Sequence, residues 1–192
     1  MDKMNHKETI KQGSSQKGLE LIIAGFGGQG ILSCGRLLAY AGMLEDKQVS
    51  WLPSYGPEMR GGTANCCVVV SDEPVGSPIL NTCDVLIAMN GPSLEKFEGN
   101  VVSGGLIIVD SSLVKNKMTR NDVSVFEVPA TRLASDRGNL TFANIYLLGK
   151  LIKETGIVEL ETIEEALEKT LPEKYHHLIP KEMEVLHEGA GY

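Results

Sequence analysis

Three short, nearly continuous apolar runs constrain the fold of this chain more than any other feature. They span Leu19 to Ala24, Val85 to Met89 and Leu106 to Val109. Strands that are buried on both faces of a mainly parallel sheet have this pattern, because both sets of side chains face a hydrophobic layer. We therefore predict that these runs form central strands of such a sheet.

Further segments supply shorter strands and amphipathic helices. Residues 49–53, 63–71 and 123–129 are strand candidates, and residues 31–44, 140–155 and 158–171 have helical periodicity. The helical stripes are predicted to bury Ile31, Cys34, Leu38 and Ala41, then Phe142, Ile145, Leu148 and Ile152, then Ile163, Ala166 and Leu167. Glycine caps are expected to end the first helix near Gly42 and the second at Gly156. A last helix after Pro172 is expected to dock elsewhere.

The order of these elements predicts one α/β domain. Strands and helices alternate, which favours a single Rossmann-like layered domain with a mainly parallel sheet flanked by helices and joined by right-handed crossovers. The length of 192 residues suits one domain. Residues 1–17 are polar and lack periodicity, so we expect a disordered tail, with the domain spanning residues 18–192.

Charge and hydropathy exclude several classes of partner. The formal net charge is −7, without a block of Lys or Arg, so neither nucleic acid nor an anionic membrane surface is expected to bind. The N-terminus lacks a signal-peptide core, and no apolar run approaches the roughly 20 residues that span a bilayer. We expect a cytoplasmic protein.

Cysteine and histidine spacing provides neither a metal site nor a catalytic pair. Cys34, Cys66, Cys67 and Cys83 do not follow a C-x-x-C pattern, so we predict buried structural thiols and no metal. The histidines lie near the chain ends, and His176-His177 is interpreted as an exposed helix-end feature. No set of nucleophile, base and orienting acid can be assembled, so no catalytic residue is assigned.

The segment Gly25-Phe26-Gly27-Gly28-Gln29-Gly30 joins the first strand to the first helix. Its spacing, G-x-G-x-x-G, is that of loops that hold a dinucleotide pyrophosphate. Such folds end their second strand in an Asp or Glu that binds the ribose, but the second strand here ends in Trp51-Leu52-Pro53-Ser54. We therefore predict a tight turn with an anion at the helix N-terminus, and keep a stand-alone dinucleotide-binding oxidoreductase as the less favoured alternative.

A second segment gathers polar groups after the second strand. In "SYGPEMRGGTANC", which begins at Ser54, residues with special backbone freedom stand beside a carboxylate, a guanidinium and an amide. A long hairpin-like connection is one interpretation. In an open α/β sheet, however, ligands gather outside the carboxyl ends of the strands, and this loop and the glycine turn are both expected there.

These motifs resemble the gamma subunit of the thiamine-diphosphate-dependent 2-oxoacid:ferredoxin oxidoreductases. The resemblance rests on "IAGFGGQGILSCGRLLA", "WLPSYGPEMRGGTANC", Ser77-Pro78 and "ANIYLLGKLIKETGIVELETIEEALE", and extends from Gly18 to about Leu171. The 2-oxoglutarate and ketoisovalerate enzymes belong to this group, and single-chain pyruvate:ferredoxin oxidoreductase contains the same module.

The resemblance implies a subunit of an enzyme complex. That complex converts a 2-oxoacid, coenzyme A and oxidised ferredoxin into acyl-CoA, carbon dioxide and reduced ferredoxin. Thiamine diphosphate with magnesium lies between alpha and beta subunits in this family, and other chains or domains carry the iron–sulfur clusters. This chain is therefore expected to bind no cofactor alone and to be inactive without its alpha and beta partners, with a delta subunit and a homodimer of the isolated chain left open.

The resemblance also implies that this subunit helps to form the coenzyme A side of the site. The candidate binding residues are Gly25, Gly27, Gly28, Gln29, Gly30, Tyr55, Glu58, Arg60, Gly61, Gly62 and Asn65. Backbone N–H groups of the turn suit a pyrophosphate, and the Arg60 guanidinium suits a phosphate. A pure scaffold remains the alternative, in which Glu58 and Arg60 form an ion pair that positions the loop.

Five residues receive weaker assignments. We interpret Arg36 as a solvated charge and Asp110 as a cap of the following turn rather than a cleft residue. The aromatic and thioether side chains of Trp51, Tyr55 and Met59 are types that anchor interfaces, so we expect them near a subunit contact.

Overall fold

The computed structural model describes residues 18–54, 63–115 and 118–192. Within them, six strands form one sheet in the order β2-β3-β1-β4-β5-β6. The strands are β1 (Gly18–Phe26), β2 (Gln48–Ser54), β3 (Thr63–Ser71), β4 (Cys83–Ala88), β5 (Val101–Asp110) and β6 (Ser124–Val128). The three apolar runs therefore form β1, β4 and β5, the centre of the sheet, as predicted.

The sheet is mainly parallel, with one reversed strand. β1, β4, β5 and β6 pair in parallel, whereas β3 is antiparallel to both β1 and β2. β2 therefore points in the same direction as β1, and β3 alone is reversed. The connection from β2 to β3 thus joins antiparallel neighbours, as the hairpin-like interpretation of this connection expects.

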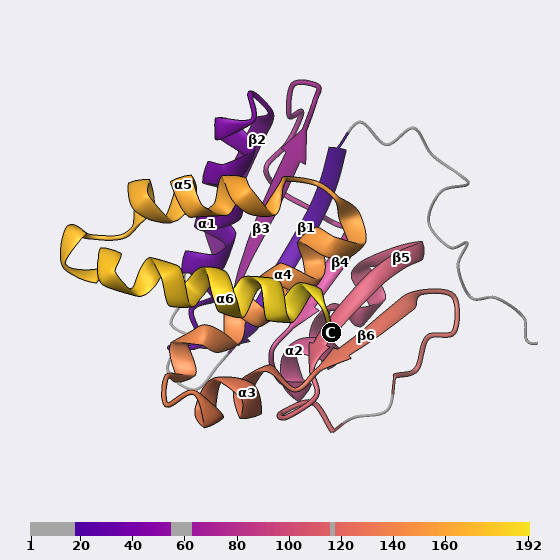
Figure 1. Cartoon of the computed structure of the whole chain (residues 1–192). Coiled ribbons are helices and arrows are strands. Elements are labelled where there is room, and N and C mark those ends of the chain that lie inside the picture. The colour runs from indigo at the N-terminus through magenta and orange to yellow at the C-terminus, as the bar shows by residue number, and fades with distance from the viewer. Residues whose placement is uncertain (1–17, 55–62, 116–117) are drawn as a thin grey trace, which may run out of the picture.

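Helices cover the two faces of the sheet unequally. The α-helices are α1 (Ile31–Leu44), α2 (Gly91–Phe97), α3 (Ala130–Asp136), α4 (Ala143–Thr155), α5 (Leu160–Thr170) and α6 (Ile179–Ala190), with short 3₁₀ turns η2 (Glu98–Asn100), η3 (Leu140–Phe142) and η4 (Glu173–Leu178). Figure 1 shows α1 and α3 to α6 on one side of the sheet. Leu94 of α2 packs into the smaller core on the opposite side.

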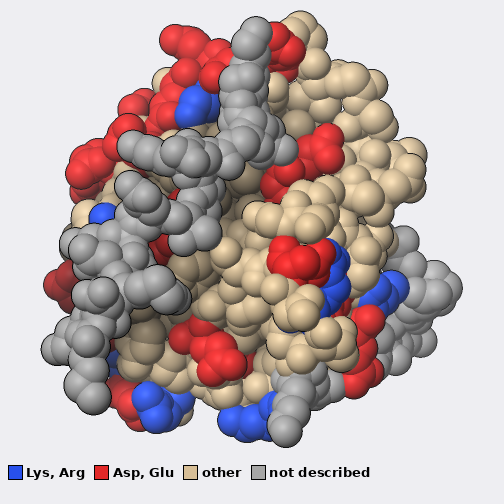
Figure 2. All heavy atoms as spheres, turned by 90° about the vertical axis from the view of Figure 1, so that its right-hand side faces the viewer, with Lys and Arg blue, Asp and Glu red and all other residues tan. Residues whose placement is uncertain are grey.

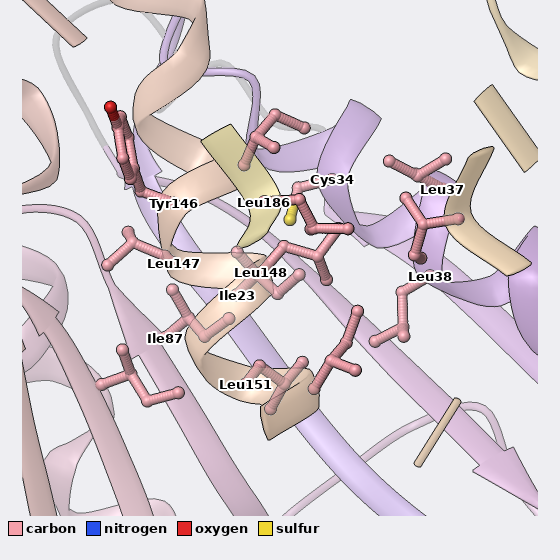
Figure 3. Close-up of a cluster of buried hydrophobic side chains, with 14 of the residues drawn as sticks. Ile23, Cys34, Leu37, Leu38, Ile87, Tyr146, Leu147, Leu148, Leu151 and Leu186 are labelled. Carbon is pink, nitrogen blue, oxygen red and sulfur yellow. The ribbon is translucent and has the colours of Figure 1, made fainter. Parts of the chain in front are cut away.

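The larger core lies between the sheet and α1, α4, α5 and α6. Figure 3 shows Cys34 and Leu38 of α1, Leu148 of α4 and Leu186 of α6 gathered in one cluster above Ile23 of β1. All the residues of the three predicted helical stripes are buried. The 3.6-residue period therefore identified the correct faces of these helices.

Two expectations about helices were wrong. The first helix does not end at Gly42 but continues to Leu44. Gly42 is buried, and a Cβ at this position would lie 2.9 Å from Val49, so glycine serves the packing of α1 on the sheet. Gly156, in contrast, ends α4 with φ 60° as predicted.

The last helix does not dock elsewhere, because α6 packs on α4 within the same domain. Glycines allow this close crossing: a side chain at Gly149 would overlap the Leu186 carbonyl, and one at Gly189 would overlap the Tyr146 carbonyl. The Tyr146 hydroxyl donates to Glu188 of α6 at 3.0 Å and accepts from Arg137. Packing and a polar contact together hold α6 in place.

Candidate functional site

The glycine turn and the ends of the 55–62 segment share the carboxyl edge of the sheet. β1 ends at Phe26 and β2 ends at Ser54, and Thr63 at the start of β3 pairs with Phe26. The prediction that both loops leave the same edge is confirmed. Five candidate residues lie outside the described residues, so their roles stay predictions: Tyr55, Glu58, Arg60, Gly61 and Gly62.

The side chain of Gln29 closes the glycine turn. Its Oε1 accepts from the Phe26 N–H at 2.5 Å, and its Nε2 donates to the Met89 carbonyl at 3.2 Å. Asn90 Nδ2 also donates to Gln29 Oε1, at 3.4 Å. The backbone N–H of Gln29 donates to the Phe26 carbonyl, so the turn itself uses one of the donors that we had assigned to an anion. Gln29 ties the end of β1 to the end of β4.

The glycines of the turn have different physical roles. Gly28 and Gly30 have left-handed φ values of 92° and 77°. A Cβ at Gly25 would lie 2.6 Å from both Gln29 Oε1 and Ile31 Cδ1, so glycine makes room for the closing side chain. Gly27 is exposed and does not have a positive φ. Gly25 and Gly27 are thus the turn glycines whose φ a side chain tolerates, and of these two only Gly27 is exposed.

The N-terminus of α1 presents uncapped donors at this edge. Its N-cap is Gly30, without a side-chain hydrogen bond, and its first turn contains no acidic residue. The Cys34 N–H donates to the Gly30 carbonyl at 2.9 Å, which begins the intrahelical ladder and leaves the N–H groups of the first turn without helical partners. Ser33 in this turn is exposed. The positive end of the helix dipole therefore lies at this edge of the sheet.

An asparagine of α4 holds the turn against the helical layer. Asn144 is 6% exposed, and its Nδ2 donates to the Gln29 carbonyl at 3.2 Å. A Cβ at Gly30 would overlap this same Nδ2 atom. Sequence reasoning missed Asn144 because its contact spans more than a hundred residues of chain, and helical periodicity marks only its apolar neighbours.

The carboxyl ends of β4 and β5 carry buried capping side chains. Asn90 accepts from the Ser93 N–H at 2.8 Å at the start of α2. Asp110 is fully buried and accepts from the N–H groups of Ser112 and Thr131 at 3.0 and 3.1 Å. The interpretation of Asp110 as a cap is confirmed, since its carboxylate serves the following turn and the first turn of α3. The missed Asn90 had a signal in the sequence, because Asn-Gly-Pro is typical of a helix start.

A pocket of about 520 Å³ lies in the helical layer beside the α1 N-terminus. Gly30, Ser33 and Arg36 line the side toward the turn, and segments of η3, α4, α5, η4 and α6 complete the walls. Arg36 is exposed and donates to the Thr170 carbonyl at 3.3 Å, so it is a largely solvated charge at the rim of the pocket, as predicted. No sequence motif predicted this pocket, because residues of six helical elements form it.

The remaining candidate residues lie within strands or in the 3₁₀ turn η4. Asn65 lies within β3, paired with Ala24 and Ser54, and is half-buried. The half-buried Trp51 packs over α1, since a Cβ at Gly35 would lie 3.1 Å from its Nε1 atom. His177 is exposed near the end of η4, as expected, but His176 is half-buried, with its Nε2 atom 3.0 Å from the Leu171 carbonyl oxygen. The proposed subunit contact of Trp51 stays a prediction.

Three of the four cysteines are buried, as predicted, and Cys67 is half-buried. Burial raises the pKa of the Cys66 and Cys83 thiols to about 12, and it raises the pKa of Cys34 as well. These thiols are therefore neutral near pH 7 and poor nucleophiles. Within residues 18–54, 63–115 and 118–192, no three His, Cys, Asp or Glu side chains are placed to hold a metal ion.

The strand order argues against a nicotinamide clamp. In dinucleotide-binding folds the second strand lies directly beside the first and parallel to it, which places its terminal carboxylate next to the glycine turn. Here the antiparallel β3 separates β1 from β2, and Ala64 pairs with Gly25 at that position. The glycine turn thus has the dinucleotide spacing without the neighbouring strand that the ribose contact requires.

Residues 20–192 match the family model described as pyruvate ferredoxin/flavodoxin oxidoreductase. The chain belongs to this family. Its sequence is 43% identical, over 88% of its length, to the ketoisovalerate oxidoreductase subunit VorA of Methanothermobacter thermautotrophicus, of which it covers 35%. The chain thus spans about a third of the length of the VorA relatives that it matches.

Solved structures of this family have the same fold. The crystal structure of a keto/oxoacid ferredoxin oxidoreductase gamma subunit from Geobacter sulfurreducens superposes with a TM-score of 0.76 at 31% identity, covering 90% of this chain and 98% of that one. The 2-oxoglutarate:ferredoxin oxidoreductase from Magnetococcus marinus, solved with 2-oxoglutarate, coenzyme A and succinyl-CoA bound, gives a TM-score of 0.82 at 25% identity. The match covers 92% of this chain and 31% of that one.

The distribution of charged side chains on one face agrees with the charge analysis. On the face in Figure 2, the Lys and Arg side chains of the described residues lie in small separate groups among acidic and uncharged residues. Among the helices that the structure describes, none combines the length and the apolar character needed to cross a bilayer.

Proposed function

We propose that this chain is the gamma-type subunit of a 2-oxoacid:ferredoxin oxidoreductase. The complex would convert a 2-oxoacid, either 2-oxoglutarate or a branched-chain oxoacid, with coenzyme A and ferredoxin, into acyl-CoA, carbon dioxide and reduced ferredoxin. The observation that carries the proposal is the match to almost the whole length of a gamma subunit, at 98% coverage of that chain. Thiamine diphosphate, magnesium and iron–sulfur clusters are assigned to the other chains of the complex.

The lengths of the relatives support direct binding of this chain to an alpha-type subunit. The chain corresponds to 35% of one VorA subunit and to 31% of a chain of the Magnetococcus enzyme, but to nearly all of the Geobacter gamma subunit. The same domain therefore occurs alone and within longer chains. We infer that this chain binds an alpha-type subunit equivalent to the remainder of those longer chains, together with a beta subunit.

Within this complex, the carboxyl edge of the sheet would form part of the coenzyme A side of the site. The α1 N-terminus supplies uncapped N–H groups and a positive dipole end beside Gly27 and Gly28, which suits a diphosphate. The chain would bind and orient coenzyme A, while the groups that react with the 2-oxoacid come from its partners. Arg60 remains a second candidate phosphate contact.

A charge placed in the first turn of α1 tests this role. Asp at a helix start stabilises a helix, so Ser33→Asp is expected to leave the fold intact. The same carboxylate would repel a diphosphate at this N-terminus, and we expect the KM for coenzyme A to rise about ten-fold, which corresponds to roughly 1.4 kcal/mol. The neutral control Ser33→Asn should bind coenzyme A nearly as well as the parent.

The KM for the 2-oxoacid separates this role from its alternative. It should not change in either Ser33 variant, because the diphosphate contact does not involve that substrate. A pure scaffold predicts that both constants stay at their parent values in the intact complex. An unchanged KM for coenzyme A in Ser33→Asp would therefore exclude the α1 N-terminus from the binding site.

A further inference from the structure

The pocket beside α1 has the size and lining of a small-molecule site. Its volume of about 520 Å³ falls within the range of roughly 300–1,000 Å³ that such sites occupy. Leu37 of α1, Ile145 of α4 and Leu171 after α5 supply apolar walls. Gly30 and Ser33 line its rim, so the pocket is continuous with the α1 N-terminus at which we propose that a diphosphate binds.

The carboxylate of Glu182 differs from the other acidic side chains of α6 in its contacts. Glu184 and Glu188 on α6 both form ion pairs with Arg137, at 3.4 and 2.7 Å. Glu182 on the same helix lines the pocket and forms no hydrogen bond or ion pair with any residue that the structure describes. Burial raises the pKa of Glu182, which indicates a poorly hydrated wall. A half-buried acceptor of this kind favours a ligand with an N–H donor.

A cationic group also lines the pocket. Arg36 follows Ser33 by one helical turn, so both lie on the pocket side of α1. The Arg36 guanidinium carries five N–H donors, and one of them donates to the Thr170 carbonyl. The pocket therefore combines an anion-binding rim, apolar walls and a hydrogen-bond acceptor.

We propose, on the basis of the function proposed above, that this pocket receives the adenosine end of coenzyme A. The adenine ring would lie between the apolar walls, with its exocyclic amino group donating to Glu182, and the phosphates would lie toward Arg36 and the α1 N-terminus. The opposite end of coenzyme A carries the thiol, which must reach a carbon held by partner chains. The nucleotide is therefore the end that a pocket within this chain can bury.

A matched pair of tryptophan variants tests the occupancy. Thr141→Trp would fill the pocket that Thr141 lines, whereas Leu140→Trp alters the preceding residue, which is 63% exposed and does not line the pocket. The probe is adenosine 3′,5′-bisphosphate, with affinity measured by calorimetry on the intact complex. We expect Thr141→Trp to weaken binding of this probe and of coenzyme A about ten-fold or more, and Leu140→Trp to change neither by more than about two-fold.

A ligand with altered hydrogen bonding tests the contact with Glu182. A coenzyme A analogue with hypoxanthine in place of adenine presents a carbonyl where the amino group was, so the parent complex should bind it about ten-fold more weakly than coenzyme A. In Glu182→Gln the amide can donate to that carbonyl, and we expect the analogue to regain affinity. The control Glu184→Gln, outside the pocket, should keep the preference of the parent. The change in base preference of Glu182→Gln can be measured even if Thr141→Trp does not fold.

The outcomes separate the pocket from the proposed function. If Ser33→Asp weakens coenzyme A binding while Thr141→Trp does not, the pocket proposal is wrong and the diphosphate site stands. If neither variant changes coenzyme A binding, both proposals are wrong. If Thr141→Trp loosens the complex and leaves the affinity for the bisphosphate unchanged, the pocket is filled by a partner chain instead. An unaltered base preference in Glu182→Gln would overturn the Glu182 contact.

Discussion

Replacing Gly30 by alanine should destabilise the domain much more than the same change at Gly28. Both glycines have left-handed φ values, 77° and 92°, so alanine costs about 1–2 kcal/mol of backbone strain at either position. A Cβ at Gly28 meets no atom within 4 Å, whereas a Cβ at Gly30 overlaps Asn144 Nδ2. Gly28→Ala therefore controls for the backbone term, and the difference between the variants measures the contact with Asn144.

The difference in free energy of unfolding between the two variants can be estimated from the contacts that Asn144 would lose. Its Nδ2 donates to the Gln29 carbonyl at 3.2 Å, and losing this hydrogen bond costs about 1 kcal/mol. Moving a side chain that is 6% exposed within a packed layer costs about 1–3 kcal/mol more. We therefore expect Gly30→Ala to lower the free energy of unfolding by about 2–4 kcal/mol more than Gly28→Ala does.

Urea unfolding followed by fluorescence provides the assay. The chain has a single tryptophan, Trp51, which packs over Gly35 of α1 and reports on the helix that the turn begins. In an Asn144→Ala background the clash is absent, and Gly30→Ala should then cost no more than Gly28→Ala. Equal costs for the two glycine variants in the parent background would refute the reasoning.

Three further predictions concern the thiols, the turn and the loop. Because the native pKa of Cys66 and Cys83 is raised to about 12, each thiol contributes stability that is complete below its unfolded pKa and is lost as pH rises toward 12. Between pH 9 and 11 the free energy of unfolding should fall by about 1.4 kcal/mol per pH unit for each thiol. Cys66→Ala should remove the contribution of one thiol to this slope. Denaturant titrations at several pH values measure the slope. Gly27→Val should change the free energy of unfolding by less than about 1 kcal/mol, since Gly27 is exposed without a positive φ, yet lower the rate of acyl-CoA formation by obstructing a phosphate. Arg60→Lys, which loses the bidentate fork, should raise the KM for coenzyme A more than that for the 2-oxoacid, and equal constants would remove Arg60 from the site.

Local patterns in the sequence predicted most elements of the fold. The apolar runs marked the central strands, and the predicted start of α1 and the predicted bounds of β3 agree with the structure. These elements follow from side-chain periodicity within a dozen residues. The short helices α2 and α3 were missed, because seven residues hold too few turns to show a period.

Contacts between distant segments were not predictable in the same way. The insertion of β3 between β1 and β2 depends on strand pairing across the chain, and α6 docks on α4 through glycines whose spacing shows no helical period. At the site, the glycine spacing identified the turn, but the closing contacts of Gln29 with Met89 and of Asn144 with Gln29 appear only in the folded chain. The pocket was equally unpredictable, since six helical elements must assemble before it forms.

Purification through a tag on this chain, from cells that express it natively, tests the central claim most directly. We predict that larger partner chains copurify, that the complex contains thiamine diphosphate and iron, and that it reduces ferredoxin only when both a 2-oxoacid and coenzyme A are present. The separated chain should retain its fold but contain neither cofactor and show no turnover with a redox dye. A chain that elutes without partners, or that alone reduces the dye with a 2-oxoacid, would contradict its assignment as a subunit of this enzyme.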